Sequence, residues 1–126
     1  MLNINQNFSF MRQFRESLLN GIKTRTNRAF SEFRNKCGPG YIMHIFIGMR
    51  TENCEKLFDS MVQDKITWNI DNAPKTEKEA RTTISPLQNE NWYDFAIKDG
   101  FTEYKDFLDY FSNHPKKSKN FICFIF

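Results

Sequence analysis

The segment 21–28 places three side chains that can do chemistry, Lys23, Thr26 and Arg28, within a few residues of one another. A threonine hydroxyl is a poor nucleophile until a neighbouring base takes its proton. A lysine can be that base if its pKa falls, through burial or through a nearby cation such as Arg28. In a regular strand, Lys23 and Thr26 would point to opposite faces, whereas Thr26 and Arg28 would share one. We therefore expect the chain to turn at Lys23 before it becomes extended.

An amphipathic helix is expected to precede this segment. Apolar residues recur at helical spacing over about 10–20, namely Phe10, Met11, Phe14 and Leu18. Ser9 is a suitable N-cap residue, and Gly21 is a suitable residue for the position after the helix end. The helix would therefore release the chain directly into the polar segment.

Two apolar segments have the composition of buried strands. Residues 41–47 are apolar at nearly every position and follow a turn at 37–40, and residues 121–126 form a short apolar run suited to a central strand. The segment 55–68 fits a helix or a strand, and its periodicity alone favours a helix.

The second half of the chain is expected to contain a polar excursion and two helices. The excursion covers about 69–91 and has room for a short strand at 81–85. One short helix would run from Trp92 to Gly100. Thr102 can cap a second helix, which has a clear apolar stripe and would end at Asn113.

Composition and cysteine content indicate one folded domain over residues 1–126. The chain is 40% hydrophobic and 16% aromatic, and it has no apolar run long enough to span a bilayer. The first 14 residues lack the basic region and the apolar stretch of a signal peptide. Three scattered cysteines, Cys37, Cys54 and Cys123, match neither a disulfide framework nor a CxxC metal site. We expect a cytoplasmic protein with reduced thiols and no membrane contact.

Basic residues concentrate in the first part of the chain. Residues 1–50 carry eight basic and two acidic side chains, whereas residues 51–126 carry ten basic and thirteen acidic ones. A basic half suits a polyanion such as RNA, and it is equally consistent with solvated surface charge.

Four segments together resemble the ASCH family. Residues 21–28 read GxKxxTxR after an amphipathic helix, which is the family signature, and 48–51 followed by Cys54 are similar to a strand-turn element of phage-type members. Residues 95–101 resemble the family's "DGF" helix pair, and 121–126 are similar to its closing strand. The resemblance extends over most of the chain.

The resemblance implies an α+β fold, a PUA-like pseudo-β-barrel of about five to six strands with flanking helices. In this family the chain returns as a strand after the 48–51 element, which favours a strand over a helix for about 57–67. The cleft would be walled by the 23–28 segment, the Arg50 turn and the helix end at Asp99.

The resemblance also implies an activity. Small ASCH enzymes are amidohydrolases that act on N4-acetylcytidine, and their pattern carried onto this chain makes Lys23, Thr26 and Asp99 the catalytic residues. These enzymes carry Glu where this chain has Asp99, which is one methylene shorter. Three further residues, on or near the same elements, are expected to contact substrate: Arg28, Arg50 and Thr24.

Two other functions remain open from the residues. The domain is a non-catalytic module that binds RNA or single-stranded nucleic acid, or it is a ribonuclease. The partner is RNA or a modified nucleoside in each case, and we expect no cofactor and no metal. The oligomeric state stays open.

Several conspicuous residues are predicted to be structural. His44 and His114 lack metal-ligand spacing to a second His or Cys. Cys54 has no nearby partner for nucleophilic chemistry and is predicted to be a packed thiol. Trp68 and Trp92 have faces on which a base can stack, but they are expected in the core.

Overall fold

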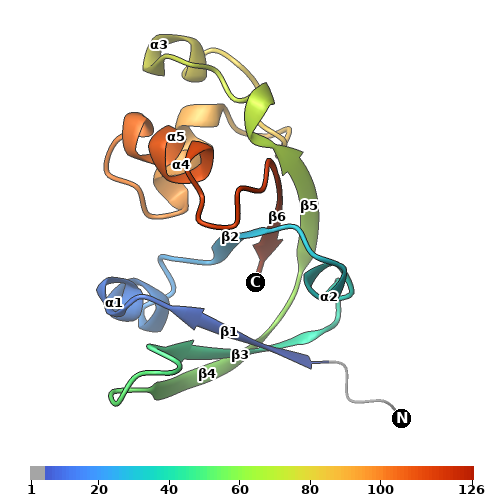
Figure 1. Ribbon diagram of the computed structural model, residues 1–126, viewed down its shortest axis with the longest axis vertical. Coiled ribbons are helices and arrows are strands. Elements are labelled where there is room, and N and C mark those ends of the chain that lie inside the picture. Colours follow the sequence, from blue (N-terminus) through green and yellow to red (C-terminus); the bar gives the residue numbers. More distant parts are fainter. Residues whose placement is uncertain (1–4) are drawn as a thin grey trace.

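Residues 5–126, which the computed structural model describes, contain six strands in two three-stranded sheets (Figure 1). The first sheet has the strand order β1-β3-β4 and the second the order β2-β6-β5. Residues 1–4, the start of the predicted domain, lie outside the described residues. The strands are β1 (Asn5–Phe10), β2 (Arg25–Ala29), β3 (Ile42–Ile47), β4 (Glu55–Met61), β5 (Asp64–Asn69) and β6 (Asn120–Ile125).

The α+β class and the strand number are confirmed. β1 pairs with β3 in parallel, and the other pairs are antiparallel. Within residues 5–126, strand pairing does not join the two sheets into a closed barrel. The chain instead passes from one sheet to the other between β4 and β5, which follow each other as one long curved ribbon (Figure 1).

The segment 55–68 is extended, so the helix favoured by its periodicity is wrong. The single strand expected over 57–67 is divided at Val62, which is fully buried. Val62 N donates to Tyr41 O at 2.8 Å in the first sheet, and Gln63 N donates to Ile125 O at 2.7 Å in the second. The periodicity favoured a helix because β4 is an edge strand whose residues are mostly half-buried or exposed. Its side chains therefore do not alternate regularly between buried and exposed, as those of a strand with one buried face would.

β6 joins two hydrophobic cores, because it is buried on both faces. Phe121 and Cys123 point into the core that Trp68 occupies, and Ile122 and Phe124 point into the core between the sheets. Alternate side chains of a strand point to opposite faces, so one apolar run serves both cores. The prediction of a central strand at 121–126 is confirmed.

Short helices cover one face of the second sheet and close the ends of the first. In Figure 1, α4 and α5 lie against β5 and β6, with α1 beside the end of β1. Trp68 stacks on Phe107 with ring centroids 5.6 Å apart, and Trp92 is buried beside them, so both tryptophans are core residues as predicted. The helices are η1 (Arg12–Phe14), α1 (Arg15–Leu19), α2 (Glu32–Asn35), η2 (Ile70–Asn72), α3 (Glu77–Ala80), α4 (Trp92–Lys98) and α5 (Tyr104–Ser112).

The predicted helix over 10–20 begins later than expected. Its first residue, Phe10, belongs to β1, Met11 is the N-cap of η1, and Ser9 is a strand residue rather than an N-cap. Gly21 has φ +78° directly after the C-cap Asn20, which confirms its expected position after the helix end. Asn113 ends α5 as predicted, but the N-cap position is Glu103 rather than Thr102, and the Glu103 side chain makes no capping hydrogen bond.

The polar excursion at 69–91 is not a bare loop. It contains η2 and α3, and it buries Leu87 and Glu90. The short strand expected at 81–85 is absent, and its only trace in the described residues is an isolated bridge between Ile84 and Asn91.

Candidate active site

A cavity of about 330 Å³ lies beside the free edge of β2. The end of β1, the end of α4 and the residues after α5 form its other walls. A volume of this order lies at the lower end of the range of small-molecule sites. Four residues that the sequence predicts for the site line it, namely Lys23, Thr26, Arg28 and Asp99.

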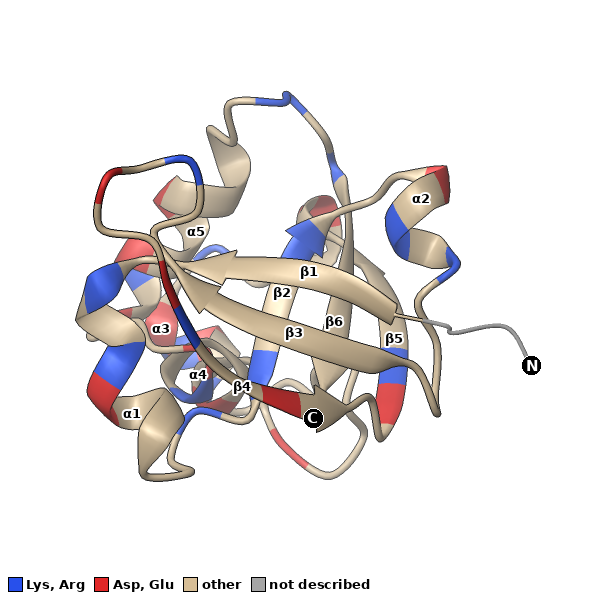
Figure 2. Ribbon diagram, turned by 90° about the horizontal axis from the view of Figure 1, so that it is seen from below, with Lys and Arg blue, Asp and Glu red and all other residues tan. Residues whose placement is uncertain are grey.

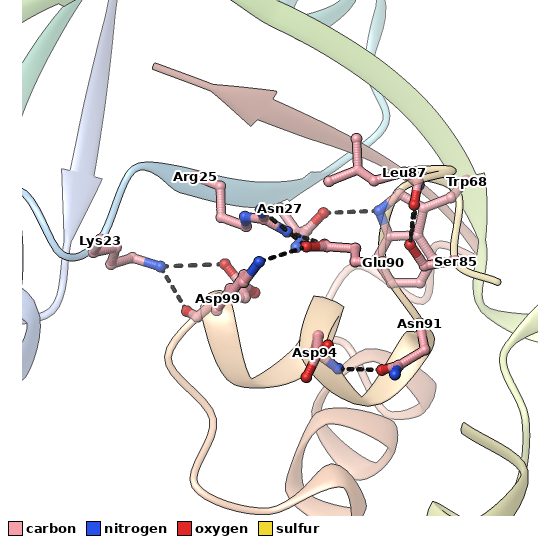
Figure 3. A network of polar contacts seen from close by, with 11 residues as sticks. Lys23, Arg25, Asn27, Trp68, Ser85, Leu87, Glu90, Asn91, Asp94 and Asp99 are labelled. Atoms are coloured by element: carbon pink, nitrogen blue, oxygen red, sulfur yellow. Dashed lines mark hydrogen bonds and ion pairs between the residues drawn. The ribbon is translucent and has the colours of Figure 1, made fainter. Parts of the chain in front are cut away.

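Lys23 and Asp99 form a buried pair on one wall (Figure 3). Lys23 Nζ donates to Asp99 O at 2.6 Å and to Asp99 Oδ1 at 3.2 Å, although the residues are 76 positions apart. The side chains are only 5% and 7% exposed. Lys23 N also donates to Ser17 O at 2.8 Å, which holds the expected turn. The ammonium lies 4.7 Å from the ring centroid of Phe14, a favourable cation–π distance.

Burial sets the protonation chemistry of this pair. It raises the pKa of the Asp99 carboxyl above its ordinary value, and the neighbouring Lys23, Asn27 and Arg28 only partly oppose this effect. A carboxyl with a raised pKa accepts a proton more readily. The pair is therefore suited to act as a base.

Thr26 and Arg28 share one face of β2, as the period of a strand requires. Arg28 Nε donates to Thr26 Oγ1 at 2.9 Å, and Arg28 Nη2 donates to Ser9 O at 2.7 Å. Because a guanidinium only donates, Thr26 must accept, and its own proton stays free for a base. Burial, reinforced by Arg34, lowers the pKa of Arg28 to about 10, so the guanidinium remains charged at neutral pH.

A second buried network fastens β2 to the loop before α4 (Figure 3). Arg25 Nη1 pairs with Glu90 Oε1, and Lys98 Nζ lies 3.1 Å from Glu90 Oε2. Asn27 Oδ1 accepts a hydrogen bond from Trp68 Nε1 at 2.8 Å. Glu90 could not be recognised as a site residue from the sequence, because its partners Arg25 and Lys98 lie in other elements and its own segment reads as a polar loop.

Two residues predicted to contact substrate, Arg50 and Thr24, do not line this cavity. Arg50 is exposed in a turn with φ +69°. The side chain of Thr24 is exposed and borders a separate hollow. The Arg50 turn was expected to form a wall of the cleft. It instead supports the cavity from behind, because Met49 N donates a hydrogen bond at 3.1 Å to Oγ of Ser9, which lines the cavity.

Other predicted roles also change with the structure. His114, expected to be only structural, lines the cavity, and burial lowers its pKa. His44 lies in the first sheet, where its Nδ1 is 2.7 Å from Asp59 Oδ1. Cys54 is exposed, so its prediction as a packed thiol is wrong, whereas Cys37 and Cys123 are buried. Cys54 follows the exposed turn before β4, where no core residue covers it.

Gly100 shapes the wall next to Asp99, and its replacement by alanine should be damaging. It has φ +110°, and an added Cβ would lie 2.6 Å from Phe14 Cε1, against the ring that faces Lys23. We expect Gly100→Ala to lower the free energy of unfolding by about 2–3 kcal/mol through strain and overpacking. Gly40→Ala is the matched control, since Gly40 has φ +92° but open space around it. Urea unfolding curves that give equal losses for both variants would contradict the importance of the Phe14 contact.

Neither membrane spans nor metal clusters are found in the described part of the chain. No helix within residues 5–126 is long and apolar enough to cross a membrane. No group of three or more His, Cys, Asp or Glu side chains among those residues is arranged to hold a metal ion. Comparisons of the chain with family models, curated proteins and solved structures give no match.

Proposed function

We propose that this chain is an ASCH-type domain that hydrolyses the acyl amide of an N4-acylated cytosine nucleoside. The observation that carries the proposal is the convergence of Lys23, Thr26 and Asp99 on one cavity of nucleoside size. The six strands, arranged in two sheets with flanking helices, support the further assignment to a PUA-like pseudo-barrel. The shorter side chain of Asp99 is accommodated, because Lys23 is held by the main-chain carbonyl of Asp99 as well as by its carboxylate.

Each residue has a defined part in the proposed reaction. Lys23, neutral after passing a proton to Asp99, takes the hydroxyl proton of Thr26. Thr26 Oγ1 then bonds to the acyl carbon, and the carbon–nitrogen bond breaks as the leaving N4 receives the proton from Lys23. Water, deprotonated by the same lysine, releases the carboxylic acid from Thr26 and restores the hydroxyl. Arg28 holds the threonine oxygen in place throughout.

The direct test is incubation of the purified protein with N4-acetylcytidine, followed by chromatography. We expect cytidine and acetate to appear in equal amounts and in proportion to the protein concentration. N4-ethylcytidine, which has no acyl bond, is the control and should remain intact. If no cytidine is released from N4-acetylcytidine or from longer N4-acyl homologues, the hydrolase proposal is wrong.

A non-catalytic RNA-binding module is the second candidate. Arg34, His114 and Lys116 line the cavity together with Arg28, which is suited to a phosphate backbone. Figure 2 shows basic positions on α1, on α2 and in the loop after α5, with acidic positions between them rather than one continuous basic strip. That interspersed pattern favours the small substrate. Binding of an RNA oligonucleotide that weakens steeply with salt, without product release, would favour the module, and strand cleavage would indicate a ribonuclease.

A further inference from the structure

Two arginines in the wall of the cavity lack an acidic partner. Arg28 and Arg34 are both half-buried, and neither forms an ion pair with an Asp or Glu side chain among residues 5–126. Asp99, the carboxylate whose charge acts on Arg28, is already paired with Lys23. Positive charges that are withdrawn from water normally have a counter-charge. The partner that the cavity can supply to these arginines is an anionic ligand.

Both guanidinium groups donate to the free edge of β1. Arg28 Nη2 donates to Ser9 O at 2.7 Å, and Arg34 Nη1 donates to Asn7 O at 2.9 Å. Residues of a strand rise about 3.3 Å each, so these two carbonyl groups lie roughly 6.6 Å apart. Figure 2 shows α2, which carries Arg34, near the start of β1, with β2 crossing farther along. Arg34 therefore lies beyond Arg28 as seen from Thr26.

One edge of the Arg34 guanidinium is free to bind a ligand. Its Nη1 donates to Gln6 Oε1 and Asn7 O, whereas Nε and Nη2 have no hydrogen-bond acceptor within residues 5–126. Arg34 has no nitrogen that is both buried and unpaired, so these two atoms are accessible from solvent. Their parallel N–H groups form the fork that binds a phosphate through two hydrogen bonds. The Phe8 ring, whose centroid is 4.1 Å from Arg34 Cζ, supports the group from one side.

The loop after α5 adds donors to the same cavity and no acid. Burial and the neighbouring Lys116 lower the pKa of His114, so its imidazole is neutral at neutral pH. His114 Nδ1 accepts from Lys116 N at 3.2 Å, so the neutral ring carries its proton on Nε2 and can donate it. Asp99 is the single acidic side chain among the described lining residues, and Lys23 compensates its charge. The remainder of the cavity is therefore positive.

We propose that Arg34 binds a phosphate monoester, so that the preferred substrate of this cavity is an N4-acylcytidine 5′-monophosphate, with the free nucleoside a weaker one. This inference rests on the proposed function, which places the acyl group at Thr26. A nucleotide separates its base from its phosphate by a sugar, and Arg34 is likewise separated from Thr26 along the edge of β1. A monoester carries close to two negative charges at neutral pH, which matches two unpaired arginines better than the single charge of a diester in RNA.

Binding of the reaction products tests the inference without turnover. The affinities of the wild-type protein for cytidine and for cytidine 5′-monophosphate are measured by calorimetry; the two probes differ only by the phosphate. We expect the monophosphate to bind about a hundredfold more tightly, the combined effect of two charge-assisted hydrogen bonds. Arg34→Gln should reduce this preference to about tenfold or less, because glutamine can still donate to Asn7 O but has neither the charge nor the fork.

Two further variants make the result decisive. Arg81→Gln is the matched control, since Arg81 also stacks on an aromatic ring, with its Cζ 3.8 Å from the centroid of Tyr93, but lies outside the cavity. It should leave the preference for the monophosphate unchanged. Arg34→Lys keeps the positive charge without the parallel donors, so its preference should fall between those of the wild type and Arg34→Gln. Thermal unfolding verifies that each variant is folded, and Arg34→Lys decides the test if Arg34→Gln does not fold.

The outcomes for the two proposals are distinct. An Arg34-dependent preference for cytidine 5′-monophosphate in a protein that releases no cytidine from N4-acetylcytidine would support the phosphate site and refute the hydrolase. Hydrolysis of N4-acetylcytidine by a protein that binds cytidine and its monophosphate equally would refute the inference alone. A preference that persists unchanged in Arg34→Gln, or no binding of either probe, would overturn the inference. Tighter binding of adenylyl-3′,5′-cytidine, whose phosphate is a diester, would overturn it in favour of RNA.

Discussion

Thr26→Ala is expected to lower the turnover of N4-acetylcytidine by about three orders of magnitude or more, with little change in the affinity for substrate. The hydroxyl is used only in the transition state, so its loss falls on the rate constant and not on binding. Arg28 keeps its hydrogen bond to Ser9 in the variant, so the wall of the cavity is retained. Steady-state kinetics measure the effect, and Thr67→Ala, at an exposed position of β5, is the matched control.

The combination with Lys23→Ala strengthens this test. Residues that act as one unit are not additive, so the double variant should be hardly slower than either single one. A Thr26→Ala protein that retains the wild-type rate would rule out covalent catalysis through this hydroxyl. The hydrolase proposal would then survive only as activation of water by the pair of Lys23 and Asp99.

Lys23→Met is expected to lower the free energy of unfolding by about 3–5 kcal/mol, because it leaves the buried Asp99 carboxylate without its cation. Chemical denaturation measures the loss. Lys119→Met is the matched control: it breaks an exposed pair with Asp71, at 68% and 60% exposure, and should cost less than about 1 kcal/mol. Lys23→Met combined with Asp99→Asn should recover most of the stability. A loss in Lys23→Met no larger than the control's would show that the buried pair is not needed for folding.

The loss in Lys23→Met should depend on pH in a defined direction. Burial already raises the pKa of Asp99, and removal of Lys23 takes away a group that opposes this shift. The folded variant then holds a proton that the unfolded chain releases above about pH 4. The loss in free energy of unfolding relative to wild type is therefore smallest below about pH 4. It grows as the pH rises from there toward the pKa of Asp99 in the folded variant. A deficit that is constant from pH 4 to pH 8 would contradict an unpaired carboxylate as its cause.

Features that depend on near neighbours in sequence were predictable. The apolar run at 121–126 required a strand covered on both sides, and β6 is that strand. The stripes that predicted α4 and α5 arise because residues three and four apart meet on one helix face. Gly21 adopts the positive φ that glycine accepts most easily, which places the turn at Lys23 where its sequence position indicated.

Features that depend on distant partners were missed. β1 was not predicted: its last residue, Phe10, was assigned to the following helix and Ser9 to the N-cap, because this strand forms only beside β3, which lies more than thirty residues away. Residues 55–68 are extended because backbone groups on either side of Val62 bond to two different sheets, a circumstance that no local periodicity reports.

The site shows the same division. The sequence by itself determined that Lys23, Thr26 and Arg28 supply side chains to the site. It also determined that a turn followed by a strand presents them. Asp99 was expected beside Lys23 only because the family resemblance implied it, and the tertiary structure brings the two together across 76 residues. Only the tertiary structure decided that Trp68, 41 residues from Asn27, orients the Asn27 amide. The physical reason is that the strength and direction of these polar contacts come from burial. Burial at the edge of β2 exists only after both hydrophobic cores have packed against β6.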